Sequence, residues 1–256
     1  MSVSVLILAG QREGYVDPLC AQAGVDRKAI IPINGRPMID YVLNALDAAD
    51  MKRPYHVSGF DAAYDERLIQ APSSTGPAGS AAAALQSGVS FPCLMTTADH
   101  PLLSRQMLEE FLENATQSGA DFCVGFAEKK VIQPAYPDVK RTYLNFSDRL
   151  VSGCNLFYIK NKQGLAAITF WKQAQHLRKH PIKLARRLGW GVLLSYVFKR
   201  LSLDGAFNYA SNKLGVVAKP ILIPIAEAAI DVDKPSDKIL VEAILSGTYT
   251  GSMHDT

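Results

Sequence analysis

The sequence predicts an α/β protein of three layers, α/β/α, in which helices cover both faces of a mainly parallel sheet. Short apolar, β-branched runs, typical of strands buried on both faces, alternate along the chain with segments of helical periodicity. Alternation at this spacing favours a Rossmann-like sheet, whose ligands bind at the carboxyl ends of the strands. The 256 residues, 48% of them hydrophobic, suffice for one large core. We therefore expect a single domain over residues 1–246.

Each expected element rests on a local pattern. The apolar runs that predict strands are residues 3–8, 55–58, 92–97, 122–126 and 155–159. The segments that predict helices are residues 38–49, 78–85, 106–115, 165–178 and a last helix after residue 235. Pro37 suits the first position of the first helix, and Ser104 suits the cap of the third. The second helix is rich in alanine and follows the turn-forming residues 73–77.

Composition excludes several classes of protein. The formal net charge is +3 and no Lys/Arg run dominates the chain, so we expect no nucleic-acid partner and a small anionic substrate instead. The four cysteines lie far apart and no signal-peptide pattern opens the chain, which favours a cytoplasmic setting. No apolar run approaches the roughly 20 residues needed to span a bilayer. Residues 247–256 are expected to be a disordered tail.

A glycine-containing loop follows the first expected strand. It begins with Leu8-Ala9-Gly10-Gln11-Arg12, and after a long polar loop a second block, which holds Lys28, starts at Arg27. Backbone N–H groups next to a glycine can approach an anion, and Arg12 and Lys28 could neutralise phosphate oxygens. An ordinary strand-to-helix loop with solvated charges is the alternative. The spacing fits neither the dinucleotide fingerprint nor the Walker loop.

Carboxylates follow two further apolar runs. Asp99 stands at the end of the buried run 92–97, where a hard oxygen ligand could hold Mg²⁺ against phosphates. Its alternative role is to cap the turn at Pro101. Asp231 and Asp233 alternate along an extended segment, so both could approach one ion. For Asp233, the alternative is a helix N-cap with Pro235 in the first turn, and of the two carboxylates we favour Asp231 as the ligand.

The order of these motifs resembles the superfamily of MobA-like and sugar-phosphate-type NTP transferases. That group includes molybdenum-cofactor nucleotidyltransferases and the cytidylyl- and uridylyltransferases of sugar and isoprenoid precursors. The blocks that carry the resemblance are Leu8-Ala9-Gly10, Lys28 to Ile39, Ala98-Asp99-His100-Pro101 and Asp231-Val232-Asp233. The resemblance implies a nucleotide-diphospho-sugar transferase fold of the GT-A-like type.

The resemblance also implies roles for individual residues. Lys28 would bind phosphate and, with Asp99, carry catalysis, while Asp99, Asp231 and Asp233 would hold Mg²⁺, or Mn²⁺ in its place. The residues implied in nucleotide binding are Leu8, Ala9, Gly10, Gln11, Arg12, Lys28, Gly76, Gly79 and Ser80. On the acceptor side, Gly153 and Asn155 would contact the second substrate.

Two departures from the family pattern stand in the first block. Gln11 replaces the second glycine, and roughly ten extra residues separate Gly14 from Lys28. Because of this insertion, Arg27 competes with Arg12 for the role of the phosphate-binding arginine.

The implied reaction moves a nucleoside monophosphate from an NTP to a small phosphorylated or hydroxylated acceptor, with release of pyrophosphate. One alternative is a glycosyltransferase that uses a nucleotide sugar, although such enzymes usually carry D-x-D where this chain has Ala98-Asp99-His100. Another is a non-catalytic nucleotide-binding module that has kept the fold.

Residues 181–215 exceed the superfamily's minimal pattern and are expected to form a helical insertion. Within it, residues 183–200 combine an apolar centre with basic shoulders. Such a segment could contact an anionic membrane peripherally. We favour the alternative, a helical lid or a subunit interface in a homodimer, because buried helices with snorkelling Lys and Arg side chains are common in soluble proteins.

Overall fold

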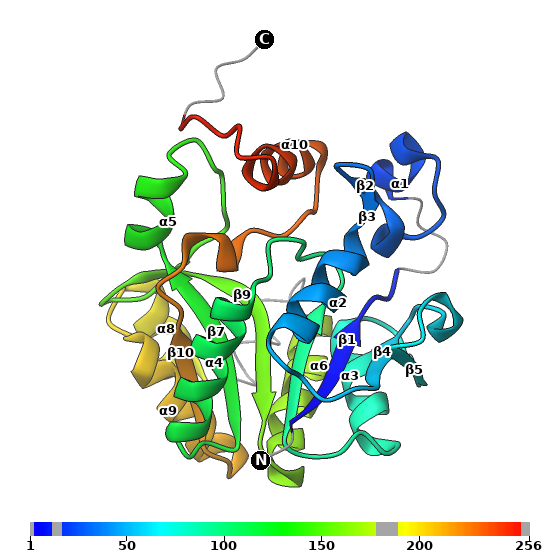
Figure 1. The fold of residues 1–256 in the computed structure, drawn as a ribbon. Helices are drawn as coiled ribbons and strands as arrows, with labels where there is room; N and C mark the ends of the chain where they lie inside the picture. Colours follow the sequence, from blue (N-terminus) through cyan, green and yellow to red (C-terminus); the bar gives the residue numbers. More distant parts are fainter. Residues whose placement is uncertain (1–2, 12–16, 178–188, 252–256) are drawn as a thin grey trace.

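The computed structural model describes residues 3–11, 17–177 and 189–251 (Figure 1). At its centre is a mixed sheet with the strand order β10-β7-β9-β6-β1-β4-β5, and β8 pairs with β9. The strands are β1 (Ser4–Leu8), β4 (Tyr55–Ser58), β5 (Leu68–Ala71), β6 (Cys93–Thr97), β7 (Phe122–Glu128), β8 (Leu144–Asn145), β9 (Leu150–Ile159) and β10 (Ala218–Leu222). The β1 strand is parallel to β4 and β6, whereas β9 is antiparallel to β6 and β7. The predicted fold class is confirmed.

Helices cover both faces of this sheet. The helices are α1 (Pro18–Ala23), α2 (Met38–Ala48), α3 (Pro77–Gln86), α4 (Arg105–Gln117), α5 (Lys129–Ala135), α6 (Leu165–Leu177), α8 (Trp190–Val197), α9 (Leu203–Leu214) and α10 (Pro235–Leu245). One core cluster joins α2 and α4 to the sheet, and a second joins α3 and α6 to its other face. Within β1, Val5 and Ile7 belong to the first cluster and Leu6 and Leu8 to the second. This alternation explains the continuous apolar run, because both faces of the strand are buried.

A third core cluster lies above the carboxyl ends of β1 and β6 (Figure 1). It joins α1, α10 and the hairpin of β2 (Pro32–Ile33) and β3 (Arg36–Pro37). Leu19, Ile31 and Val232 are buried there. The cluster therefore brings segments from the beginning and the end of the chain to the sheet edge where ligands of this fold class bind.

Local sequence patterns predicted the first residues of most of the expected helices to within one position. The Ser104 hydroxyl accepts a hydrogen bond from the backbone N–H of Met107 at 3.3 Å, as expected of an N-cap. Pro37, expected as the first residue of α2, instead ends β3 and stands at the N-cap position. The reason is the hairpin with β2, which sequence periodicity did not reveal.

The strand expected at residues 155–159 begins five residues earlier, at Leu150. Asn155, expected to open it, lies within it with a φ of 53°, where the pairing register between β7 and β9 shifts. A β-bulge of this kind re-aims a side chain within a strand. Of the predicted helical insertion, the described part holds α8 and α9. No helix in the described ranges is both long and apolar enough to span a bilayer.

Candidate active site

Lys28 lies at the centre of the candidate site, at the start of a 3₁₀ turn, Lys28–Ile30. Its Nζ atom donates hydrogen bonds to Asp99 Oδ2 and to Asp233 Oδ1, each at 2.7 Å. The structure thus gathers a lysine from the first strand-to-helix connection, a carboxylate from the end of β6 and a carboxylate from the segment before α10. These are three of the residues that the sequence motifs single out.

Backbone hydrogen bonds hold the three segments at the same edge of the sheet. The N–H of Ala98 donates to the carbonyl of Leu8 at 3.0 Å, which joins the ends of β6 and β1. The N–H of Val232 donates to the carbonyl of Asp99 at 2.9 Å. Asp231 and Asp233 therefore flank Asp99, and the site is anchored by main-chain contacts as well as by charge.

The electrostatics of this group favour the ionised forms of Lys28 and Asp99. Burial alone would lower the pKa of Lys28, but Asp99 and Asp233 outweigh it and raise that pKa above its usual value. Burial alone would raise the pKa of Asp99, yet Lys28 holds it below its ordinary value. One ammonium between two carboxylates leaves a net negative charge, which attracts a further cation.

The carboxylates meet the requirements of a divalent-ion site. Mg²⁺ is commonly held by one or two protein carboxylates together with substrate phosphates and water. Asp99 Oδ1 is buried and accepts no hydrogen bond from a described residue, although the Thr97 hydroxyl is near enough to lower the Asp99 pKa. Asp233 is 67% exposed at its side chain and open to solvent. The described residues contain no group of three or more His, Cys, Asp or Glu side chains that could hold a metal ion.

Asp231 has different partners from Asp233. Its Oδ1 atom accepts a hydrogen bond from Arg141 Nη2 at 2.5 Å, and its Oδ2 atom accepts one from Asn155 Nδ2 at 2.8 Å. The bulge in β9 places Asn155 for this contact. The structure thus separates the predicted pair: Asp233 joins Lys28, whereas Asp231 joins the residue expected on the acceptor side.

The alternative role of Asp233 as a helix N-cap is wrong. Lys234 occupies the N-cap position of α10. The backbone N–H groups of Asp233 and Lys234 both donate to Asp237 Oδ2 at 3.1 Å. Because Asp237 satisfies these donors, the carboxylate of Asp233 is available to Lys28.

The loop after β1 is held close to Lys28 by the residue that departs from the family pattern. Gln11 Oε1 accepts a hydrogen bond from the backbone N–H of Lys28 at 3.3 Å. Next to it, Gly10 packs against Gly59, and a Cβ added at Gly59 would lie 2.4 Å from the Gly10 Cα. Arg12 lies outside the described residues. Arg27 Nε is 4.0 Å from the Asp26 carboxylate, in an exposed pair.

The segment expected to read the base forms the start of α3. Gly76 precedes the helix with a φ of 74°, and a Cβ added at Gly79 would lie 3.3 Å from Ser74 Oγ. The Ser80 hydroxyl donates to the Ser74 carbonyl at 2.9 Å and accepts from the Ser74 N–H at 3.1 Å. Ser80 therefore folds the preceding loop onto the helix, and contact of this segment with a base stays a prediction. Gly153 is exposed on β9, with open space where a Cβ would stand.

Arg141 is a site residue that the motifs did not reveal. It follows a polar stretch without regular periodicity, and only its contact with Asp231 shows its place. Its side chain is 12% exposed, and the Nε atom is buried without a hydrogen-bond partner among the described residues. Near it, His100 is buried and its Nε2 atom lies 3.2 Å from the Glu227 carbonyl. Burial lowers the pKa of His100.

A Rossmann-like three-layer fold with a lysine and two carboxylates at the carboxyl edge of its sheet suits a transferase of the nucleotidyltransferase class. The chain belongs to the family of the MobA-like NTP transferase domain, whose sequence model matches residues 6–188. No curated protein matches the sequence.

Solved structures agree with this assignment. A hypothetical transferase from Thermus thermophilus is 30% identical, with a TM-score of 0.78 over 93% of this chain and 100% of that one. The 2-C-methyl-D-erythritol 4-phosphate cytidylyltransferase of the same organism is 19% identical, with a TM-score of 0.54 over 96% of this chain and all of that one. A CMP:2-keto-3-deoxy-manno-octonic acid synthetase in complex with CTP is 12% identical, with a TM-score of 0.60 over 97% and 100%. The last two share the fold with this chain.

Proposed function

We propose that this protein transfers a nucleoside monophosphate from an NTP to a small phosphorylated or hydroxylated acceptor, in a reaction that requires Mg²⁺. The observation that carries the proposal is the position of Lys28, whose ammonium lies between the carboxylates of Asp99 and Asp233. The two carboxylates suit a divalent ion, and the ammonium suits the phosphates of the triphosphate that accompanies it.

An acceptor oxygen attacks the α-phosphorus of the NTP and forms a new P–O bond. The bond from the α-phosphorus to the oxygen that links it to the β-phosphorus breaks, and pyrophosphate leaves. Lys28 offsets the charge that develops on the phosphate oxygens. Asp99 and Asp233 are the residues that would hold Mg²⁺, which would neutralise charge on the same phosphates. The loop with Gly10 and Gln11 lies against Lys28 and offers backbone N–H groups to the nucleotide.

Asp231, Arg141 and Asn155 would orient the acceptor. Both oxygens of Asp231 accept hydrogen bonds, so this carboxylate fixes the direction of the Arg141 and Asn155 side chains. The guanidinium of Arg141, held by Asp231, supplies positive charge for an anionic acceptor. A phosphate oxygen on that acceptor is already a nucleophile and requires no strong base.

The proposal is tested by incubating the protein with each NTP, Mg²⁺ and a panel of phosphate monoesters and alcohols, and by measuring pyrophosphate. At least one pair should release pyrophosphate, and Asp99→Ala should slow that release by about 100-fold or more. If NTPs bind but no pair reacts, the protein is a nucleotide-binding module. If a nucleoside diphosphate is released from a nucleotide sugar instead, it is a glycosyltransferase.

A further inference from the structure

Two adjoining cavities lie on the face of the sheet that α3 also covers, one between α6, α8 and α9 and the other between α6 and α9. The first has a volume of about 320 Å³ and is lined by side chains from all three helices and from the β8 region. Phe146, Phe170, Leu193, Tyr196 and Ala210 contribute to this lining. The second has a volume of about 390 Å³ and shares Phe170, Lys213 and Leu214 with the first.

Both hollows open in part to solvent, so they are clefts rather than closed voids. Clefts of about 300–1,000 Å³ that are lined mainly by apolar and aromatic side chains are typical of small-molecule sites. Burying such a lining against a hydrocarbon guest removes apolar surface from water. The lining of the first cavity is almost wholly hydrocarbon and aromatic. Even the polar atom of Tyr196 is engaged, because its hydroxyl accepts a hydrogen bond from the Asn145 N–H at 3.3 Å.

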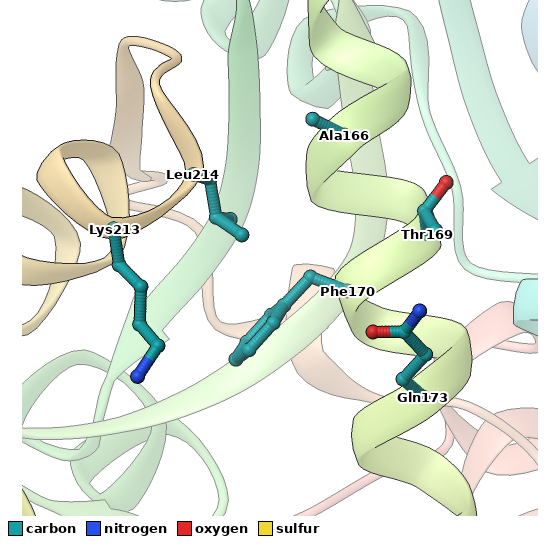
Figure 2. Close-up of a pocket in the computed structure, with 6 residues that line it drawn as sticks. All are labelled: Ala166, Thr169, Phe170, Gln173, Lys213 and Leu214. Atoms are coloured by element: carbon teal, nitrogen blue, oxygen red, sulfur yellow. The ribbon is translucent and has the colours of Figure 1, made fainter. Parts of the chain in front are cut away.

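Few of the described side chains that line the cavities are polar. Lys213 is the charged residue that borders both cavities, and its Nζ atom lies 5.8 Å from the centre of the Tyr209 ring. Figure 2 shows Phe170 extending from α6 toward Lys213 and Leu214 of α9. The second cavity adds the side chains of Thr169 and Gln173. Among the described residues that line the two cavities, the site therefore combines an apolar surface with the cation of Lys213.

We propose that these cavities bind a single-chain amphiphile, with its hydrocarbon chain between α6, α8 and α9 and its anionic head at Lys213. A carboxylate or a phosphate head would complement the ammonium. Most of the lining of the first cavity belongs to α8 and α9, which lie beyond residue 188, where the match to the transferase family ends. The lining of this site shares no residue with the group of Lys28, Asp99 and Asp233 at the sheet edge. Binding of an amphiphile therefore does not depend on the proposed nucleotidyl transfer.

The test uses calorimetric titration of the full chain with dodecanoate, dodecyl phosphate and dodecanol, each below its micelle concentration. We expect saturable binding of one molecule per chain. Lys213→Gln should weaken binding of both anions by about tenfold, the loss expected when a charged hydrogen bond is removed, and leave dodecanol unchanged. The ratio of the two anion affinities identifies the preferred head group. Equal affinity of wild type and Lys213→Gln for the anions would refute the assignment of Lys213.

Filling the cavity should abolish binding of all three probes. Ala210→Phe and Ala206→Phe place a ring in the lining from successive turns of α9, so one variant serves if the other does not fold. The matched control is Phe198→Ser, just after α8, which removes an exposed ring that lies outside the cavities. Loss of binding in the control, unchanged binding in a folded filling variant, or no saturable binding by wild type would each overturn the proposal.

Discussion

The ammonium of Lys28 lies 2.7 Å from the carboxylate of Asp233, although the two residues are 205 positions apart in the sequence. The same ammonium contacts Asp99, which belongs to the middle of the chain. A surface ion pair contributes little to stability, but Lys28 and Asp99 are both mostly buried, at 21% and 23% exposure of their side chains. Buried charges in proteins have a partner of opposite charge or a function. Here one partner of Lys28, the carboxylate of Asp233, is open to solvent.

Replacing Lys28 by Met should remove the charge that offsets the phosphates. We expect kcat for pyrophosphate release to fall by about 100- to 1,000-fold, as when a preorganised donor is removed from other active sites. Lys52→Met, at an exposed position, is the matched control and should retain full activity. Steady-state kinetics at saturating Mg²⁺ measures both. Equal rates for the two variants would exclude Lys28 from the reaction.

Replacing Asp231 by Asn should affect the acceptor more than the nucleotide. The substitution keeps the shape but removes the charge that fixes Arg141. Loss of a charged hydrogen bond corresponds to about 10- to 100-fold, so KM for the acceptor should rise in this range while KM for the NTP stays nearly constant. A rise confined to the NTP would place Asp231 with the nucleotide instead.

Gly59→Ala should disturb the loop after β1. Gly59 has a φ of 84°, and an added Cβ would lie 2.4 Å from the Gly10 Cα. Gly35→Ala is the matched control, because Gly35 has a φ of 79° with nothing within 4 Å of its added Cβ. Each variant should lose about 1–3 kcal/mol of unfolding free energy from backbone strain, and Gly59→Ala should lose more and bind NTP more weakly. Equal losses in urea unfolding, with equal NTP affinity, would show that the Gly10 contact has no role.

Asp47→Asn should make stability less dependent on pH. Burial would raise the pKa of Asp47, but hydrogen bonds from Arg67 and Arg53 outweigh it and lower that pKa. A carboxylate with a lowered folded-state pKa stabilises the fold above the unfolded value of about 4, and this contribution is lost as the pH falls through the folded-state pKa.

The variant should therefore lose about 1–3 kcal/mol of unfolding free energy at neutral pH, and the difference from wild type should shrink in acid. Urea unfolding at pH 7 and pH 3 measures it, with the exposed Asp138→Asn as control. A deficit that stays constant between the two pH values would show that the charge of Asp47 is not its cause.

Much of the site was predictable because its residues follow strands. Parallel strands deliver their carboxyl ends to one edge, so Asp99 after β6 and the loop after β1 had to be neighbours. The apolar run of β1 likewise predicted burial on both faces. The sequence favoured Asp231 over Asp233, whereas it is Asp233 that contacts Lys28. Both residues satisfy the same alternation, and only their partners in the folded chain separate them.

Features that depend on distant contacts escaped the sequence patterns. Arg141 lies in an irregular segment, and only folding brings it to Asp231. The bulge at Asn155 and the short β2–β3 hairpin leave no periodic signal, because each involves few residues. The cavities beside α9 could not be foreseen either, since the apolar residues that line them have the spacing of an ordinary buried helix face.

The central claim is that Asp99 and Asp233 hold one divalent ion together with the phosphates of an NTP beside Lys28. The most direct measurement is electron paramagnetic resonance titration of Mn²⁺ in the presence of a non-hydrolysable NTP. We predict one bound Mn²⁺ per chain, with affinity reduced by at least about tenfold in Asp99→Asn and in Asp233→Asn and unchanged in Asp138→Asn. The same Mn²⁺ affinity in all four proteins would contradict the account.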